Sequence, residues 1–132
     1  MRESILSANA ANNARTALVD AGSPPGYLYI RTGAAPAETT DADTGTLLST
    51  HVLSNPAFGA AAATISTANS IANATCAATG TAGHWRIKNA AGVTIFQGTV
   101  GIATEDLVFD DADFEASATI SITSFTLTQP QA

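Results

Sequence analysis

A break at residues 22–26 divides this chain into a short helical part and a long β part. The run there is Gly-Ser-Pro-Pro-Gly. Glycine commonly ends helices, and proline is not tolerated in a helix interior. Apolar residues recur with the helical period before this break and alternate with period two after it. The sequence therefore predicts an all-β fold preceded by a short N-terminal α-helix.

The helical part covers residues 2–21. Its apolar stripe consists of Leu6, Ala10, Ala14, Ala17 and Leu18, and the opposite side carries Asn9, Asn13, Thr16 and Asp20. Because these apolar side chains are mostly small, they favour a flat partner at close range. We expect the stripe to cover one face or an open end of the sheet. The alternative is that the helix docks onto a neighbouring subunit.

A strand and a long loop follow the break. The strand, residues 27–32, turns Leu28 and Ile30 to one face and Tyr27, Tyr29 and Arg31 to the other. The loop, residues 33–45, holds a proline, small residues and the carboxylates of Glu38, Asp41 and Asp43. This composition cannot make a core and predicts a surface loop or arm, and such loops often carry function.

The remaining strands alternate with turn signals. They are expected at residues 46–53, at two short stretches within 57–76, and at residues 82–88, 93–100, 107–109 and 117–128. For the strand at residues 46–53 the buried face stays undetermined, because either Leu48 and Val52 or Leu47 and Leu53 could form it. Ile120 and Phe125 lie on opposite faces of the last strand, so a bulge or a change of sheet is expected near residues 123–124.

The clearest local signal is a hairpin with the loop Asn-Ala-Ala-Gly at residues 89–92. Trp85 and Ile87 share one face of its first strand, and His84, Arg86 and Lys88 share the other. We expect His84 to be an exposed or interface side chain. About eight such strands describe a β-sandwich, with a jelly roll as the first topology, in one domain spanning residues 1–132.

Composition excludes several function classes. A net charge of -6 with five cationic residues argues against nucleic-acid binding. No stretch approaches the about 20 apolar residues that span a bilayer, so no membrane partner is expected. The single cysteine, Cys76, rules out an internal disulfide and fits folding in a reducing cytosol.

Catalytic and cofactor motifs are also missing from the sequence. His51 and His84 are the only imidazoles, and neither has further ligands at zinc-site spacing. No nucleophile elbow, phosphate loop or dinucleotide fingerprint occurs. We therefore expect a protein that is not an enzyme and that has no cofactor or metal. Whether the acidic residues between 105 and 115 hold a calcium ion stays open, since they lack the spacing of a calcium loop.

Contact surfaces are the remaining candidates for function. The candidate residues are Tyr27, Tyr29, Arg31, Glu38, Asp41, Asp43, His84, Arg86 and Lys88. Tyrosine and arginine are enriched in protein interfaces, and the two tyrosines with Arg31 form the best such cluster. The alternative for the tyrosines is that they pack under the N-terminal helix.

Several turn and core segments carry a resemblance that covers nearly the whole chain. They are GYLYIRTG (26–33), GTLL (45–48), NPAFG (55–59), GTAGHWR (80–86), QGTVG (97–101) and SFTLT (124–128). This pattern resembles a family of structural proteins of tailed-bacteriophage heads. The resemblance implies a capsid cement or decoration protein, made in the bacterial cytoplasm, that binds the major capsid protein on the virion surface as a homo-oligomer, a dimer or trimer. A tail or neck component, or a carbohydrate-binding module of a tail fibre, would share most of these features.

Overall fold

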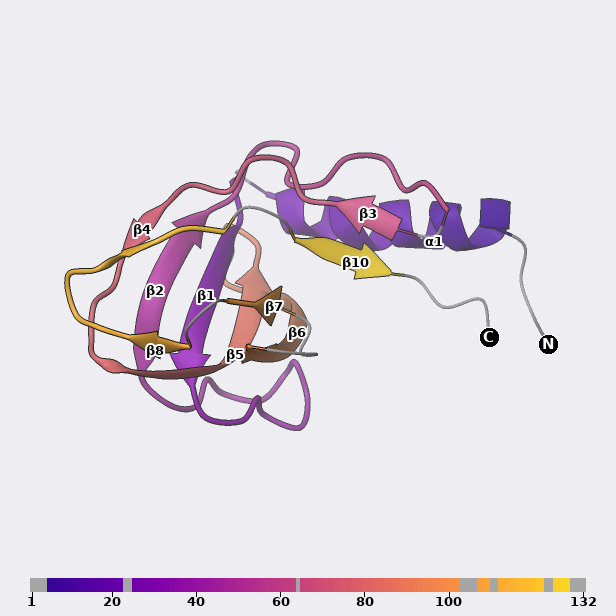
Figure 1. Cartoon of the computed structure of the whole chain (residues 1–132). Coiled ribbons are helices and arrows are strands. Elements are labelled where there is room, and N and C mark those ends of the chain that lie inside the picture. Colours follow the sequence, from indigo (N-terminus) through magenta and orange to yellow (C-terminus); the bar gives the residue numbers. More distant parts are fainter. Residues whose placement is uncertain are drawn as a thin grey trace.

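The computed structural model consists mostly of β-strands in antiparallel sheets, with one short helix (Figure 1). It describes residues 5–22, 25–63, 65–102, 107–109, 112–122 and 125–128. The helix α1 spans Ile5–Ala17 and continues as a 3-10 turn, Leu18–Asp20. The strands are β1 (Tyr27–Thr32), β2 (Leu47–Val52), β3 (Ile65–Thr67), β4 (Ala74–Thr75), β5 (Gly80–Lys88), β6 (Thr94–Gly101), β7 (Leu107–Val108), β8 (Asp113–Phe114), β9 (Thr119–Ile120) and β10 (Thr126–Thr128).

The largest sheet has the order β2-β1-β5-β6-β7, and β8 pairs with the start of β5. All of its pairs are antiparallel except β6 with β7. The alternation predicted for β1 is confirmed, because Leu28 and Ile30 are fully buried while Tyr27 and Tyr29 are partly exposed. Ile30 pairs with Trp85, which is 2 % exposed, so this face of the sheet carries the core.

The predicted hairpin is confirmed as β5 and β6. The Asn89 side chain accepts hydrogen bonds from the backbone N–H groups of Ala91 and Val93, at 3.1 Å each, and Gly92 takes a positive φ of 86°. Asparagine and glycine at these places suit a tight turn, because one caps the free donors and the other adopts the left-handed conformation without strain.

Two small sheets complete the β-structure, β4 with β9 and β3 with β10. The single strand expected over residues 117–128 is wrong, because β9 and β10 are separate short strands. Of the two alternatives expected near residues 123–124, a bulge or a change of sheet, the change of sheet is confirmed, since β9 and β10 belong to different sheets; residues 123–124 themselves lie outside the described residues. Ile120, Ile122 and Phe125 all join the core cluster. The sequence did not determine which residues of β2 are buried. The structure buries Leu48 and Leu53, one from each of the two alternatives, and leaves Val52 43 % exposed. A register irregularity of β2 opposite Ile30 and Arg31 changes the alternation within the strand, which explains this mixture.

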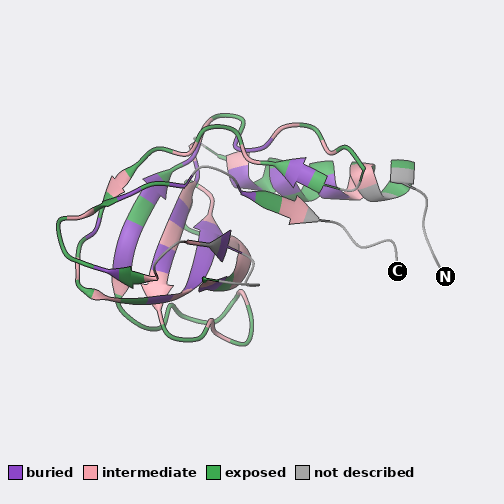
Figure 2. Cartoon of the chain, viewed as in Figure 1, coloured by how far each residue is buried: buried purple, intermediate pink, exposed green. Residues whose placement is uncertain are grey.

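The helix corrects the prediction about its buried side. Its apolar stripe faces solvent, with Leu6 81 % and Leu18 51 % exposed and the alanines between them also exposed. The buried side carries Asn12, Thr16 and the following Val19 (Figure 2). Figure 1 shows α1 beside β3 and β10, and the helix touches the main sheet where Arg15 lies 5.4 Å from the centre of the Phe96 ring in β6. The expected cover of the sheet by the apolar stripe is therefore wrong.

Polar contacts explain this orientation. Asn12 donates from Nδ2 to the Ser66 hydroxyl at 2.8 Å and to the Leu127 carbonyl at 3.2 Å, which ties the helix to β3 and β10. Asn13 accepts a hydrogen bond from the Ala61 backbone N–H at 2.7 Å. A buried amide must be hydrogen-bonded, so these partners determine which side of the helix turns inward.

Candidate functional site

The loop of residues 33–45 folds back over the outer face of β5. Arg86 and His84 were expected on an exposed face with Lys88, but the loop leaves Arg86 only 1 % exposed and His84 fully buried. That expectation of exposure is wrong for both residues, and Lys88 remains partly exposed. What this face presents to a partner is therefore the outer side of the loop, with Arg86 beneath it.

Arg86 is the anchor of the loop. Its Nη atoms donate to the backbone carbonyls of Glu38 (3.1 Å), Thr39 (3.3 Å) and Asp41 (3.0 Å) and to the Asp43 carboxylate (2.8 Å). The planar guanidinium suits this task because it holds several donors in a fixed fork. The polar loop and the buried arginine thus satisfy each other.

Gln97 completes the anchor from the neighbouring strand. Its side-chain oxygen accepts hydrogen bonds from Nε and Nη2 of Arg86 at 3.0 and 2.9 Å, and its amide Nε2 donates to the Pro36 carbonyl at 2.7 Å. The sequence reasoning missed Gln97. Gln97 lies opposite Arg86 across β5 and β6, but a register shift next to Lys88 hides this pairing from a count along the sequence.

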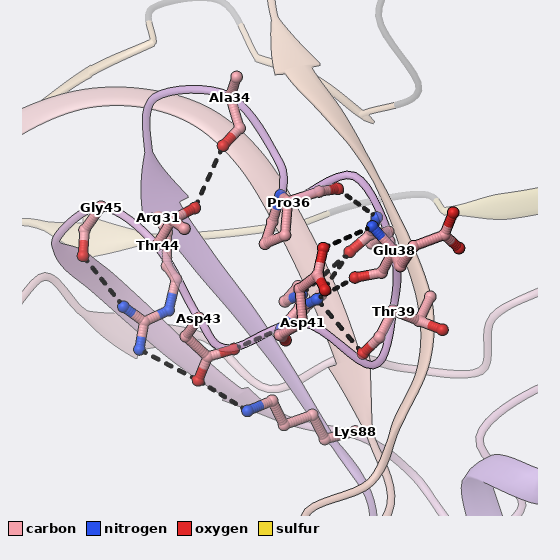
Figure 3. A network of polar contacts seen from close by, with 12 residues as sticks. Arg31, Ala34, Pro36, Glu38, Thr39, Asp41, Asp43, Thr44, Gly45 and Lys88 are labelled. Atoms are coloured by element: carbon pink, nitrogen blue, oxygen red, sulfur yellow. Dashed lines mark hydrogen bonds and ion pairs between the residues drawn. The ribbon is translucent and has the colours of Figure 1, made fainter.

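Asp43 is the meeting point of three cations (Figure 3). Its carboxylate lies 2.8 Å from Arg86, 2.7 Å from Lys88 and 3.5 Å from Arg31. The hydrogen bond from Lys88, reinforced by that from Arg86, lowers the pKa of Asp43 to about 2. The ion pairs of Arg31, Arg86 and Lys88 thus converge on this one loop carboxylate.

Two glycines set the ends of the loop. Gly33 and Gly45 both take a positive φ, 76° and 70° respectively, which side chains with a Cβ rarely adopt. The His84 Nδ1 donates to the Gly33 carbonyl at 2.9 Å, and Arg31 donates to the Gly45 carbonyl at 3.2 Å. Because a carbonyl only accepts, His84 carries its proton on Nδ1. Both ends of the loop are therefore held to the sheet.

The surface beside the loop is aromatic. Tyr27 and Tyr29 lie 6.2 Å apart between ring centroids, and Lys88 Nζ lies 5.6 Å from the centre of the Tyr29 ring. Both tyrosines are partly exposed on the same face as Val52, which pairs with Tyr27. Burial raises the pKa of Tyr29, so its hydroxyl stays neutral at ordinary pH. The structure thus brings the two tyrosines, Lys88 and the acidic loop onto one side of the sheet.

A groove of about 500 Å³ lies between the loop and the hairpin turn, lined in part by Asp41, Asp43, Lys88 and Val93. Glu38 and Asp41 are exposed beside it. Asp41 accepts a hydrogen bond from the Glu38 backbone N–H at 3.0 Å, which fixes the turn of the loop. The outer side of the loop is therefore an ordered acidic surface.

One serine and histidine pair has the contacts of a catalytic dyad but lies in the interior. The Ser49 hydroxyl meets His51 Nε2 at 3.0 Å, and His51 Nδ1 donates to the Ala72 carbonyl at 2.8 Å. Both side chains are at most 1 % exposed, so no substrate reaches them. Burial lowers the pKa of His51 and keeps it neutral. The pair satisfies polar groups within the fold.

The acidic segment near the C-terminal end is only partly described. Glu105, Asp106, Asp110 and Asp111 lie outside the described residues. Asp113 accepts a hydrogen bond from the Thr81 hydroxyl at 2.7 Å, and Glu115 is exposed. Within the described ranges, no three histidine, cysteine or acidic side chains gather closely enough to hold a metal ion.

No helix in the described part of the chain has the length and apolar character needed to cross a membrane. Comparisons with models of known protein families, with curated proteins and with solved structures found no match. The candidate site is the surface formed by the loop of residues 33–45 and the two tyrosines, called the loop–tyrosine face below.

Proposed function

We propose that the chain is a structural protein of a tailed-bacteriophage virion, without enzymatic activity, that acts as a capsid cement or decoration protein. In this role it binds the lattice of the major capsid protein on the virion surface. The resemblance of its turn and core segments to phage head proteins supports the class of protein. The partner surface that we assign is the loop–tyrosine face.

The observation that carries this proposal is the way the loop is held. A flexible acidic loop would lose conformational entropy on binding, about 1–2 kcal/mol for each backbone residue that becomes fixed. Arg86 holds this loop before any partner arrives, through three backbone carbonyls and Asp43. A preordered loop next to partly exposed tyrosines is a surface that can bind a protein with little loss of conformational entropy.

The architecture that we propose is a β-sandwich with jelly-roll connections. The packing of the core supports this architecture, because residues from the small sheets and their connections pack in the same core cluster as the buried face of the main sheet. They are Phe58, Ile120, Ile122 and Phe125. Trp85 and Phe125 meet edge to face at 4.8 Å between ring centroids, which links the main sheet to the segment before β10.

Two other roles remain as outcomes of the same test. A tail or neck component would bind at few copies per particle. A carbohydrate-binding module needs an exposed aromatic platform, and Trp85 cannot supply one because it is 2 % exposed. The tyrosine pair is the other candidate platform, and its rings are tilted by 40° and do not form one flat surface.

The test is to mix the purified chain with mature capsids that lack it, sediment the capsids and count the bound copies. A cement protein binds at hundreds of copies per capsid in proportion to the lattice. The double variant Tyr27→Ser with Tyr29→Ser is expected to lose this binding. The variant Glu115→Gln, which changes an exposed carboxylate elsewhere, serves as the control. Binding of only a few copies would refute the proposal.

A further inference from the structure

A hollow of about 590 Å³ lies beside the short strands β8 and β9. Its apolar lining includes Phe109, Phe114 and Ile120, and its polar lining includes Asp113 and Glu115. Pockets that bind small molecules commonly have volumes of about 300–1,000 Å³ and combine apolar walls with a few polar groups. These residues lie outside the loop–tyrosine face, so the hollow is a separate candidate site.

The apolar wall contains an aromatic pair. Phe109 and Phe114 meet edge to face, with ring centroids 5.2 Å apart and ring planes at 88°. Phe114 and Ile120 belong to the core and are nearly buried, whereas Phe109 is only partly buried. The Phe109 ring is therefore the part of the wall that a ligand contacts most readily. An aromatic ring attracts a cation over its face, because the face carries the negative end of the ring quadrupole.

The carboxylates stand on an ordered backbone. Asp113 pairs with Thr81 across β8 and β5, and its carboxylate accepts a hydrogen bond from the Thr81 hydroxyl at 2.7 Å. Glu115 begins a turn that is closed by a hydrogen bond from the Ala118 N–H to the Glu115 carbonyl at 3.0 Å. Two backbone hydrogen bonds of 2.8 Å tie this turn to Cys76, which follows β4. A ligand that binds here therefore does not have to order the backbone first.

The charges around the hollow favour a cation. The described lining contains the acidic Asp113 and Glu115 but no lysine, arginine or histidine. The chain as a whole carries a net charge of -6, so its field attracts cations and repels anions. A metal ion does not fit as well, because no three histidine, cysteine or acidic side chains of the described residues gather closely enough to hold one.

We propose that this hollow binds a small organic cation, in which an ammonium group is joined to an apolar body. The ammonium group lies against the carboxylates of Asp113 and Glu115, and the apolar body lies against Phe109 and Ile120. An inorganic cation would leave the apolar wall without a contact, and an uncharged molecule would leave the carboxylates without one. The site does not depend on the proposed capsid binding, because it uses other residues.

A titration of the full chain, followed by assigned proton–nitrogen correlation spectra, tests the class of ligand. The probe is the hexylammonium ion, added up to about 20 mM, which is enough to detect a dissociation constant on the order of 1 mM. Hexanol is the matched uncharged molecule, hexanoate reverses the charge, and the ammonium ion lacks the apolar chain. Hexylammonium is expected to give saturating shifts at the amides of Phe109, Glu115 and Ile120, and the other three compounds much smaller ones.

Two variants test the residues. Glu115→Gln keeps the size of an exposed side chain but removes its charge, and should weaken hexylammonium binding about fivefold. Phe109→Leu keeps an apolar side chain but removes the ring, and should weaken binding about threefold. The matched control, Glu38→Gln, removes an exposed carboxylate on the loop and should bind hexylammonium as the wild type does. The same spectra show whether each variant is folded.

Three results would overturn the proposal. They are equal shifts with hexylammonium and hexanol, shifts centred outside the hollow, and wild-type affinity for hexylammonium in the Glu115→Gln variant. Each result leaves the count of capsid-bound copies unaffected, so a failure of this site and a failure of the proposed function are distinguishable.

Discussion

Replacing Arg86 with methionine removes the anchor of the loop while keeping a long side chain in its place. The change leaves the carbonyls of Glu38, Thr39 and Asp41 without their donor and removes one of the three cations at Asp43. Breaking a fully buried charged pair costs about 3–5 kcal/mol. Here Asp43 keeps Lys88 and Arg31, and the carbonyls reach water once the loop lifts, so we expect a loss of about 2–3 kcal/mol.

Thermal unfolding followed by circular dichroism measures this loss. For a chain of this length, each kcal/mol shifts Tm by about 4 °C, so the Arg86→Met variant should melt about 10 °C lower. The matched control is Arg31→Met, which removes the same charge from a pair at 3.5 Å whose arginine is partly exposed. That control should cost less than about 1 kcal/mol.

Loop release gives an independent measurement on the same variants. A protease that cuts after glutamate should cleave at Glu38 much faster in the Arg86→Met variant than in the wild type, since the loop must leave the sheet to enter a protease site. The Arg31→Met control should be cut at nearly the wild-type rate. The result that would refute this role is a free energy of unfolding for Arg86→Met within about 1 kcal/mol of the wild-type value, together with a loop that stays resistant to the protease. Arg86 would then not hold the loop.

Three further outcomes are expected. Burial keeps His51 neutral in the folded state, and the unfolded chain takes up its proton below pH about 6.5, so Tm should fall as the pH drops from 7 to 5 and fall less in His51→Gln. Gly83→Ala places a Cβ 2.7 Å from the Gly33 nitrogen and should cost about 1–3 kcal/mol by thermal unfolding, whereas Gly59→Ala, with its nearest contact at 3.7 Å, should cost less. In sedimentation assays, added salt should weaken capsid binding, because the loop–tyrosine face carries exposed carboxylates.

The strands and the hairpin were predictable because local patterns determine them. The alternation of buried and partly exposed side chains in residues 27–30 is present in the structure, because successive side chains of a strand point to opposite faces of the sheet. The hairpin follows from asparagine and glycine at residues 89 and 92. The change of sheet near the end of the chain followed from the switch of apolar parity between Ile120 and Phe125, which no single flat strand can bury.

The buried arginine was not predictable from the same patterns. Arg86 lies on the polar face of an alternating strand, which normally means exposure to water. The loop that covers it lies about 45 residues away along the sequence and has no apolar pattern of its own. It contacts Arg86 through three backbone carbonyls and the Asp43 carboxylate, and no local pattern in the sequence indicates such contacts. The register irregularity next to Lys88 also shifts β6, so a simple count through the turn does not place Gln97 opposite Arg86.

The helix shows a different limit of pattern reading. Periodicity identified the two sides of α1, but it could not say which side the domain itself would use. The outcome depended on Asn12, whose amide finds Ser66 and Leu127 at a distance in sequence that no local pattern encodes. An apolar stripe therefore indicates where a helix can be buried, and the partner that buries it has to be found separately.

The charges of the loop–tyrosine face are unevenly compensated. Asp43 forms ion pairs with Arg31, Arg86 and Lys88. The exposed carboxylates of Glu38 and Asp41 take part in none of these ion pairs. A second copy is acidic too and is repelled there, so this face selects a partner that brings its own cations.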